Sequence, residues 1–213
     1  MTVQPKIKRG LTPQDILNKK YTLILWQGEW RLAFKQPEIC GVWFIWGNSG
    51  NGKSSFVMKL VKELSKYMDV FYNPLEENTR YSMQEHMERN GMSAAPGKVL
   101  FLKESLEDME ARMNRPKSPQ AVVIDSYQYL GLTYRQYIDF KERHPKKLII
   151  FISHAKGSNP KGDHADSVMY DADLKIWVEG YVAHSKGRYI GETGTYTIWE
   201  EGAAEYWGKT TDN

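Results

Sequence analysis

Val42-Trp43-Phe44-Ile45-Trp46 runs directly into Gly47-Asn48-Ser49-Gly50-Asn51-Gly52-Lys53-Ser54, and no other segment of the chain is as informative. The first part is wholly apolar and predicts a buried strand. The second part has the GxxxxGKS pattern, in which glycines let backbone N–H groups turn toward phosphate oxygens. In such a loop Lys53 reaches the β- and γ-phosphates, and the Ser54 hydroxyl binds Mg²⁺. We therefore expect ATP and Mg²⁺ as ligands. The expected nucleotide-binding residues are Gly47, Asn48, Ser49, Gly50, Asn51, Gly52, Lys53, Ser54 and Ser55.

The residues after this loop predict a helix. Phe56, Val57, Leu60, Val61 and Leu64 form an apolar stripe at helical spacing, and such a stripe packs a helix against a sheet. The positive end of the helix dipole would then face the bound phosphates. Strand, loop and helix together make a chance match to the pattern an inadequate explanation.

Further apolar strands alternate with amphipathic helices along the rest of the chain. Strands are predicted at 69–72, 98–102, 121–125 and 147–154, and a helix at 105–113. This alternation is typical of an α/β fold with a mainly parallel central sheet and helices on both faces.

Asp125 ends one of these strands and is the predicted second ligand of Mg²⁺, with Ser54. Alone, an aspartate at this position is often a turn or helix cap. Ser126 follows it, so a glutamate adjacent to the metal ligand, as many ATPases use for a general base, is missing here. A base must come from another strand.

Glu76 and Glu77 follow the strand at 69–72 and are candidates for that base. A glutamate at this edge of the sheet can orient and deprotonate the attacking water. A glutamate in the first turn of a helix starting near Thr79 would instead stabilise that helix, and we expect one residue in each role. His154 ends a further strand, where a histidine is either a structural hydrogen-bond partner or a functional group.

The first forty residues are predicted to form an N-terminal extension (1–40), and residues 41–213 the main domain. In the extension, Thr12 is a predicted N-cap, with Pro13 and Asp15 in the first turn of a helix that ends near Lys20. A second short helix is predicted at 29–35. The aromatic tail after residue 195 is expected to form an edge hairpin and C-terminal packing.

Composition bounds the class of protein. The 213 residues are 41% hydrophobic and 26% charged, which is typical of a folded globular chain. The longest aliphatic and aromatic run, 148–152, is far too short to cross a bilayer, and the N-terminus lacks an apolar signal region. We expect a soluble cytoplasmic protein with no membrane partner. Cys40 is the single cysteine and is interpreted as a small apolar residue, and a net charge of +3 does not identify a partner.

The order of these motifs resembles that of the RecA-like ATPases. After the phosphate loop come Leu75-Glu76-Glu77, then Val122-Val123-Ile124-Asp125-Ser126, and then Ile152-Ser153-His154-Ala155-Lys156-Gly157. The RadA/Sms branch and the ATPase domain of DnaB-type replicative helicases are the most similar members. Asp171-Ala172-Asp173 and Lys186-Gly187-Arg188 extend the resemblance, which covers about residues 41–199.

This resemblance implies a RecA-like P-loop fold with a C-terminal β-hairpin, and it implies roles for particular residues. Glu76 would be the catalytic base, and His154 the sensor of the γ-phosphate. Lys186 and Arg188 would act in trans on a neighbouring subunit's nucleotide, although alone they suit a solvated turn. Lys156 and Lys161 lie in segment 156–166, which matches the family's mobile DNA-binding loop and is otherwise simply a flexible loop.

The sequence thus predicts a Mg²⁺-dependent ATPase that forms a homo-oligomeric ring or filament and acts on single-stranded DNA in replication or recombination. One alternative is a recombination or annealing protein that uses ATP as an assembly switch with little turnover. Another is a small-molecule kinase, which would need an arginine-rich lid, with Arg80 and Arg89 as the candidates.

Overall fold

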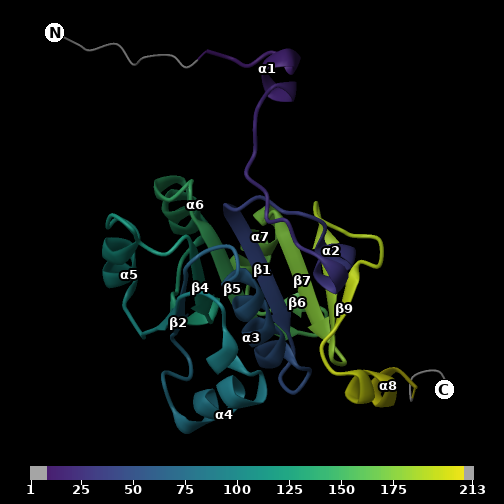
Figure 1. Cartoon of the computed structure of the whole chain (residues 1–213). Helices are drawn as coiled ribbons and strands as arrows, with labels where there is room; N and C mark the ends of the chain where they lie inside the picture. Colours follow the sequence, from purple (N-terminus) through teal and green to yellow (C-terminus); the bar gives the residue numbers. More distant parts are fainter. Residues whose placement is uncertain (1–8, 209–213) are drawn as a thin grey trace.

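The computed structural model describes residues 9–208 and contains one nine-stranded sheet flanked by helices (Figure 1). Eight strands follow the order β3-β2-β4-β5-β1-β7-β8-β9, and β6 pairs with β5. The pairs from β3 across to β7 are parallel, whereas β8 and β9 are antiparallel to their neighbours. The predicted α/β class with a mainly parallel sheet is confirmed.

The strands are β1 (Gly41–Gly47), β2 (Val70–Pro74), β3 (Val99–Phe101), β4 (Ala121–Asp125), β5 (Leu148–Lys156), β6 (Asn159–Pro160), β7 (Leu174–Glu179), β8 (Val182–Gly187) and β9 (Thr195–Thr197). The α-helices are α1 (Pro13–Leu17), α2 (Gly28–Phe34), α3 (Lys53–Leu64), α4 (Tyr81–Arg89), α5 (Leu106–Met113), α6 (Tyr134–Arg143), α7 (Asp163–Asp171) and α8 (Glu200–Gly208). Two short 3₁₀ turns, η1 (Met92–Ala94) and η2 (Tyr127–Tyr129), complete the elements.

Helices cover both faces of the sheet, because the side chains of each central strand alternate between two cores. In β1, Trp43 and Ile45 join the core beneath α2 and α3, whereas Phe44 and Trp46 join the core beneath α5, α6 and α7. All four side chains are at most 3% exposed. A strand buried on both faces reads as a continuous apolar run, which is why this segment was recognisable in the sequence.

Topology brings the functional motifs to one edge of the sheet. Because β1, β2, β4 and β5 are parallel neighbours, their carboxyl ends at Gly47, Pro74, Asp125 and His154 lie together. We call this the carboxyl edge, and the side where these strands begin the amino edge. Ligands of open α/β sheets bind at the carboxyl edge.

The N-terminal segment divides into an exposed and a packed part. Thr12 caps α1 with the predicted capping box, but the helix ends at Leu17 rather than near Lys20 and buries none of its residues. It stands apart from the sheet, beyond the amino edge (Figure 1). In contrast, Trp26 and Phe34 are fully buried in the same core as Trp43. The predicted boundary after residue 40 therefore falls inside a packed unit.

The C-terminal segment forms the far side of the sheet. β7 and β8 make an antiparallel hairpin, β9 adds an edge strand, and the chain continues into α8. Within residues 9–208, no helix has the length and apolar character needed to cross a membrane.

Candidate functional site

The phosphate loop connects β1 to α3, and three of its glycines are required by its backbone. Gly50 and Gly52 have φ values of +78° and +90°, in the left-handed region that glycine favours. A Cβ at Gly47 would lie 2.3 Å from the carbonyl oxygen of Val178, so only glycine fits beside β7. The loop conformation is therefore set by the chain itself.

Side chains within the loop fasten it to two neighbouring segments. The Asn51 side chain accepts a hydrogen bond from the backbone N–H of Gly180 at 2.8 Å, and its backbone carbonyl oxygen accepts one from Tyr181 at 3.1 Å. The Asn48 amide donates to the carbonyl oxygen of Gly157 at 3.2 Å. The phosphate loop thus contacts both the β7–β8 turn and the segment after β5.

A cavity of about 350 Å³ lies over the loop. It is lined by Asn48, Ser49, Gly50, Gly52, Lys53, Ser54, Ser55, Glu77, His86, Arg89 and Tyr181. His86 and Arg89 come from one face of α4, and sequence reasoning gave neither a role in nucleotide binding. Their i, i+3 spacing on a helix after Glu77 is the signal that would have suggested them.

A second cavity of about 510 Å³ shares part of its lining with the first, because both include Ser55, Arg89 and Tyr181. Its remaining residues are Lys59, Asn90, Ile198 and Trp199. The exposed Trp199 ring meets Tyr181 edge-on, with ring centres 5.0 Å apart. The pair of cavities therefore offers a polar half at the phosphate loop and an aromatic half beside it.

Asp125 lies at the carboxyl end of β4 and has an aromatic partner that the sequence did not reveal. The hydroxyl of Tyr72 donates a hydrogen bond to its Oδ2 at 2.5 Å. Burial raises the pKa of Asp125, as do Glu76 and Glu77, whereas the Tyr72 hydrogen bond and the positive charge of Lys53 oppose that rise. Asp125 is therefore an incompletely compensated carboxylate next to the phosphate loop.

The structure brings Glu76 and His154 together from two different strands. The Oε2 atom of Glu76 lies 3.0 Å from Nε2 of His154, and the backbone N–H of Glu76 donates to the carbonyl oxygen of Asp125 at 3.0 Å. Glu77 faces the cavity over the loop. The expected helix-stabilising role for one glutamate is wrong, because α4 begins only at Tyr81 and has no acidic residue in its first turn.

The residues present fit Mg²⁺ bound together with a nucleotide. Within the described part of the chain, no cluster of three or more acidic, histidine or cysteine side chains is arranged to hold a metal. Mg²⁺ in phosphate sites typically uses one or two protein ligands and takes the rest from phosphates and water. Ser54 and Asp125 supply such a pair of oxygen donors.

Comparisons with known proteins place this geometry in a fold family. The chain matches no protein-family model, and no curated protein matches its sequence. Its structure is similar to that of the flagellar accessory protein FlaH from Methanocaldococcus jannaschii, with a TM-score of 0.56 and 16% identity over 84% of this chain and 92% of that one. It is also similar to the solved ATPase domain of a helicase, with a TM-score of 0.50 and 12% identity over 75% of this chain and 84% of that one.

The fold is that of a RecA-like P-loop ATPase core. The sequence-based resemblance is confirmed at the level of fold. In this RecA-like core, the phosphate loop, Asp125 and the pair Glu76–His154 share the carboxyl edge.

The segment carrying Lys156 and Lys161 differs from the flexible loop that its composition predicted. Lys156 ends β5 and pairs with Asn159 of β6 in a tight hairpin, and α7 begins at Asp163. Gly157, with φ of +65°, permits the two-residue turn. Both lysine side chains are exposed. The hairpin is held by the Gln128 amide, which donates to Ser153 Oγ at 2.7 Å and to the carbonyl oxygen of Lys161 at 3.0 Å.

Lys186 and Arg188 lie at the amino edge of the RecA-like core, away from its own phosphate loop. In the β7–β8 hairpin, Val182 is at the phosphate-loop end and Gly187 at the other. Arg188 is paired with Asp173 at 2.6 Å yet 71% exposed, and the Lys186 amine lies 4.8 Å from the centre of the Trp177 ring. Arg188 also lines a surface cavity of about 470 Å³ with Arg31 and Lys35.

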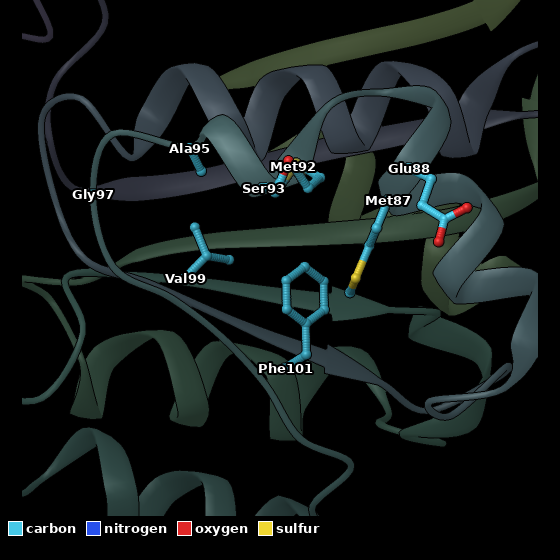
Figure 2. Close-up of a pocket in the computed structure, with 8 residues that line it drawn as sticks. All are labelled: Met87, Glu88, Met92, Ser93, Ala95, Gly97, Val99 and Phe101. Atoms are coloured by element: carbon cyan, nitrogen blue, oxygen red, sulfur yellow. The ribbon is translucent and has the colours of Figure 1, made fainter.

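A further cavity, of about 410 Å³, lies between α4, η1 and the edge strand β3 (Figure 2). Met87, Val99 and Phe101 surround it, and Glu88 and Ser93 are its only side chains with polar groups. Its lining has no cation to receive phosphate. The nucleotide site is therefore assigned to the cavities that include the phosphate loop and Arg89.

Proposed function

We propose that this chain is a cytoplasmic, Mg²⁺-dependent ATPase that assembles with copies of itself and couples ATP hydrolysis to single-stranded DNA in replication or recombination. The observation that carries the proposal is the convergence at one sheet edge of a phosphate loop, a buried aspartate and a glutamate–histidine pair. Each of these three elements matches a separate requirement of phosphoryl transfer to water.

ATP would occupy both parts of the nucleotide site. Backbone N–H groups of the loop and Lys53 would hold the phosphates, with Mg²⁺ bound by Ser54 and Asp125. The cavity beside the loop would take the nucleoside, since Tyr181 and Trp199 offer aromatic surface and Arg89 a planar cation. The bound Mg²⁺ would supply charge neutralisation of the phosphates.

Glu76 would accept the proton of the attacking water. Its contact with His154, 3.0 Å between Oε2 and Nε2, would hold the carboxylate in one orientation and connect it to the hairpin that follows β5. The backbone bond from Glu76 to Asp125 keeps the base and the metal ligand on adjacent strands. Asn48, in the phosphate loop, reaches the same hairpin through Gly157. Nucleotide state and hairpin position would therefore be linked.

Single-stranded DNA would contact the exposed Lys156 and Lys161 on this hairpin. Two lysines in one chain bind weakly, but repetition around an oligomer makes the binding multivalent and salt-sensitive. Lys186 and Arg188 would reach the nucleotide of a neighbouring copy. Arg31 and Lys35, which share a cavity with Arg188, add positive charge to the surface that would face that copy's anionic carboxyl edge.

The test measures ATP hydrolysis with and without single-stranded DNA, together with DNA affinity as a function of salt. We expect DNA to stimulate the parental protein. Replacing Lys156 and Lys161 with alanine should remove this stimulation, spare most basal hydrolysis, and flatten the salt slope by about 1.4 per engaged subunit, at about 0.7 per phosphate contact.

The matched control replaces Lys98 and Lys146, two exposed lysines just before β3 and β5 at the amino edge. It removes the same charge and should leave stimulation intact. Equal losses in both double variants would show that charge alone, rather than the hairpin, governs DNA binding. A parental protein with no affinity for single-stranded DNA in the presence of ATP would contradict the proposal.

A further inference from the structure

Tyr72 is a buried aromatic residue inside β2 whose hydroxyl is directed to the carboxyl edge. It is 1% exposed, and its ring packs on Phe101 with centres 5.0 Å apart. Because β2 and β4 pair with Tyr72 opposite Val123 and Pro74 opposite Asp125, Tyr72 and Asp125 lie diagonally on one face of the sheet. Only a long side chain spans that diagonal, and the tyrosine hydroxyl reaches Asp125 Oδ2 at 2.5 Å.

The direction of this hydrogen bond is fixed by chemistry. Burial and the neighbouring Asp125 hold the pKa of Tyr72 well above its usual value, so the phenol keeps its proton and donates it. A carboxylate that accepts a strong hydrogen bond on one oxygen has the other oxygen free for a cation. Mg²⁺ demands near-ideal octahedral geometry, so the orientation of each protein ligand matters.

We propose that Tyr72 is a positioning residue for the metal site: its hydroxyl fixes Oδ2 of Asp125 and thereby sets which carboxylate oxygen faces Mg²⁺. The inference rests on the proposed function, because it concerns the Mg²⁺–nucleotide complex of the same site. It adds a partner outside the direct metal ligands, and such partners typically change metal affinity when they are removed. The competing explanation is that a buried tyrosine merely needs an acceptor for its hydroxyl.

Tyr72→Phe removes this hydroxyl and leaves the ring. The chain offers a close control in Tyr137, which is also fully buried and donates to a carboxylate, Asp171 Oδ2, at 2.5 Å. Asp171 ends α7 and lies close in sequence to the Asp173–Arg188 pair of the amino edge. Tyr137→Phe therefore deletes the same kind of bond far from the phosphate loop.

The experiment measures the affinity of the full chain for a fluorescent ATP analogue across a Mg²⁺ titration and in EDTA. For Tyr72→Phe, we expect the Mg²⁺ concentration that gives half-maximal tightening to rise about tenfold. Affinity in EDTA should stay at the parental level. Tyr137→Phe should change neither quantity, although both variants should lower the Tm.

A Tyr72→Phe protein with the parental Mg²⁺ dependence and a lowered Tm would overturn the inference and assign the hydroxyl a structural role only. A parental protein that binds the analogue equally well with and without Mg²⁺ would overturn the proposed metal-dependent function, and this inference with it. The two failures are distinguished by the parental titration, which is measured first.

Discussion

The carboxyl and amino edges of the same sheet are built in opposite ways. At the carboxyl edge, Asp125 and Glu76 are held by bonds from neighbouring strands, and Glu76 meets His154. At the amino edge, Arg188 is largely exposed and its guanidinium pairs with Asp173, which is itself bound to the backbone of Val42. One edge orients its functional groups within a single chain, whereas the other presents its cation outward.

This difference indicates a division of labour between copies. A base, a metal ligand and a phosphate loop are assembled at one edge, but Lys186 and Arg188 lie at the far end of their hairpin. A head-to-tail contact, in which the amino edge of one copy meets the carboxyl edge of the next, would complete the site. The following experiments break or sharpen this comparison.

Replacing Lys53 with alanine should have the largest effect, because it removes the fixed cation at the β- and γ-phosphates. We expect turnover to fall below detection and ATP affinity to weaken. Lys62→Ala, on the same helix but with its amine near the Asn90 carbonyl oxygen, is the control and should hydrolyse ATP at the parental rate. Steady-state hydrolysis and equilibrium binding provide the measurements.

Replacing Arg188 with alanine should lower hydrolysis by about 10³-fold if the arginine acts in trans, at the lower end of values for such residues. Parental specific activity should then rise with protein concentration. Mixing Arg188→Ala with Lys53→Ala chains should restore part of the activity, since some interfaces then combine an intact loop with an intact arginine. No recovery in verified mixed oligomers would place Arg188 outside the site.

Glu76→Gln keeps the shape of the side chain and removes the base, so we expect about a 10²-fold loss of hydrolysis with ATP affinity retained. Glu77→Gln is the paired variant, and it should affect turnover less. Both are compared by single-turnover hydrolysis and by equilibrium binding. A normal rate for Glu76→Gln together with a loss for Glu77→Gln would move the base by one residue, and normal rates for both would remove this mechanism.

The smallest effect is expected in α1, beyond the amino edge. Leu17 is 78% exposed, so Leu17→Ala should change the free energy of unfolding by no more than about 0.5 kcal/mol. Trp26→Ala, at a fully buried position of the segment after α1, should cost about 3–5 kcal/mol. Urea denaturation of both variants measures the two values. A large loss from Leu17→Ala would mean that α1 stabilises its own chain.

The sequence predicted those parts of the fold that depend on local pattern. The apolar run of β1 and the glycine spacing after it are local signals, and the order of the later strands was enough to suggest the sheet. Specific roles for Glu76 and His154 came from the family resemblance, and their direct contact was not foreseen. The bond from Tyr72 to Asp125 was missed because it depends on the register between two strands, and a tyrosine within an apolar strand looks like ordinary core.

Composition misled the interpretation of residues 156–166. Its glycines and proline suggested irregular structure, but Gly157 serves a tight hairpin turn and Pro160 is a buried strand residue. Similarly, Glu77 was a reasonable helix-stabilising residue from its position alone. The bounds of α4, which begins four residues later, depend on packing that the local sequence does not encode.

The β7–β8 hairpin gives the molecule a mechanical property of its own. At one end, Gly180 and Tyr181 hold Asn51 of the phosphate loop, and at the other end lie Lys186 and Arg188. Six residues of strand span about 20 Å, and the two strands share a continuous hydrogen-bonded ladder that resists bending. In an assembly of the proposed kind, a displacement of the loop in one copy would be transmitted along this stiff ribbon to the nucleotide of the next. The order in which neighbouring sites hydrolyse ATP would then depend on a single turn of backbone.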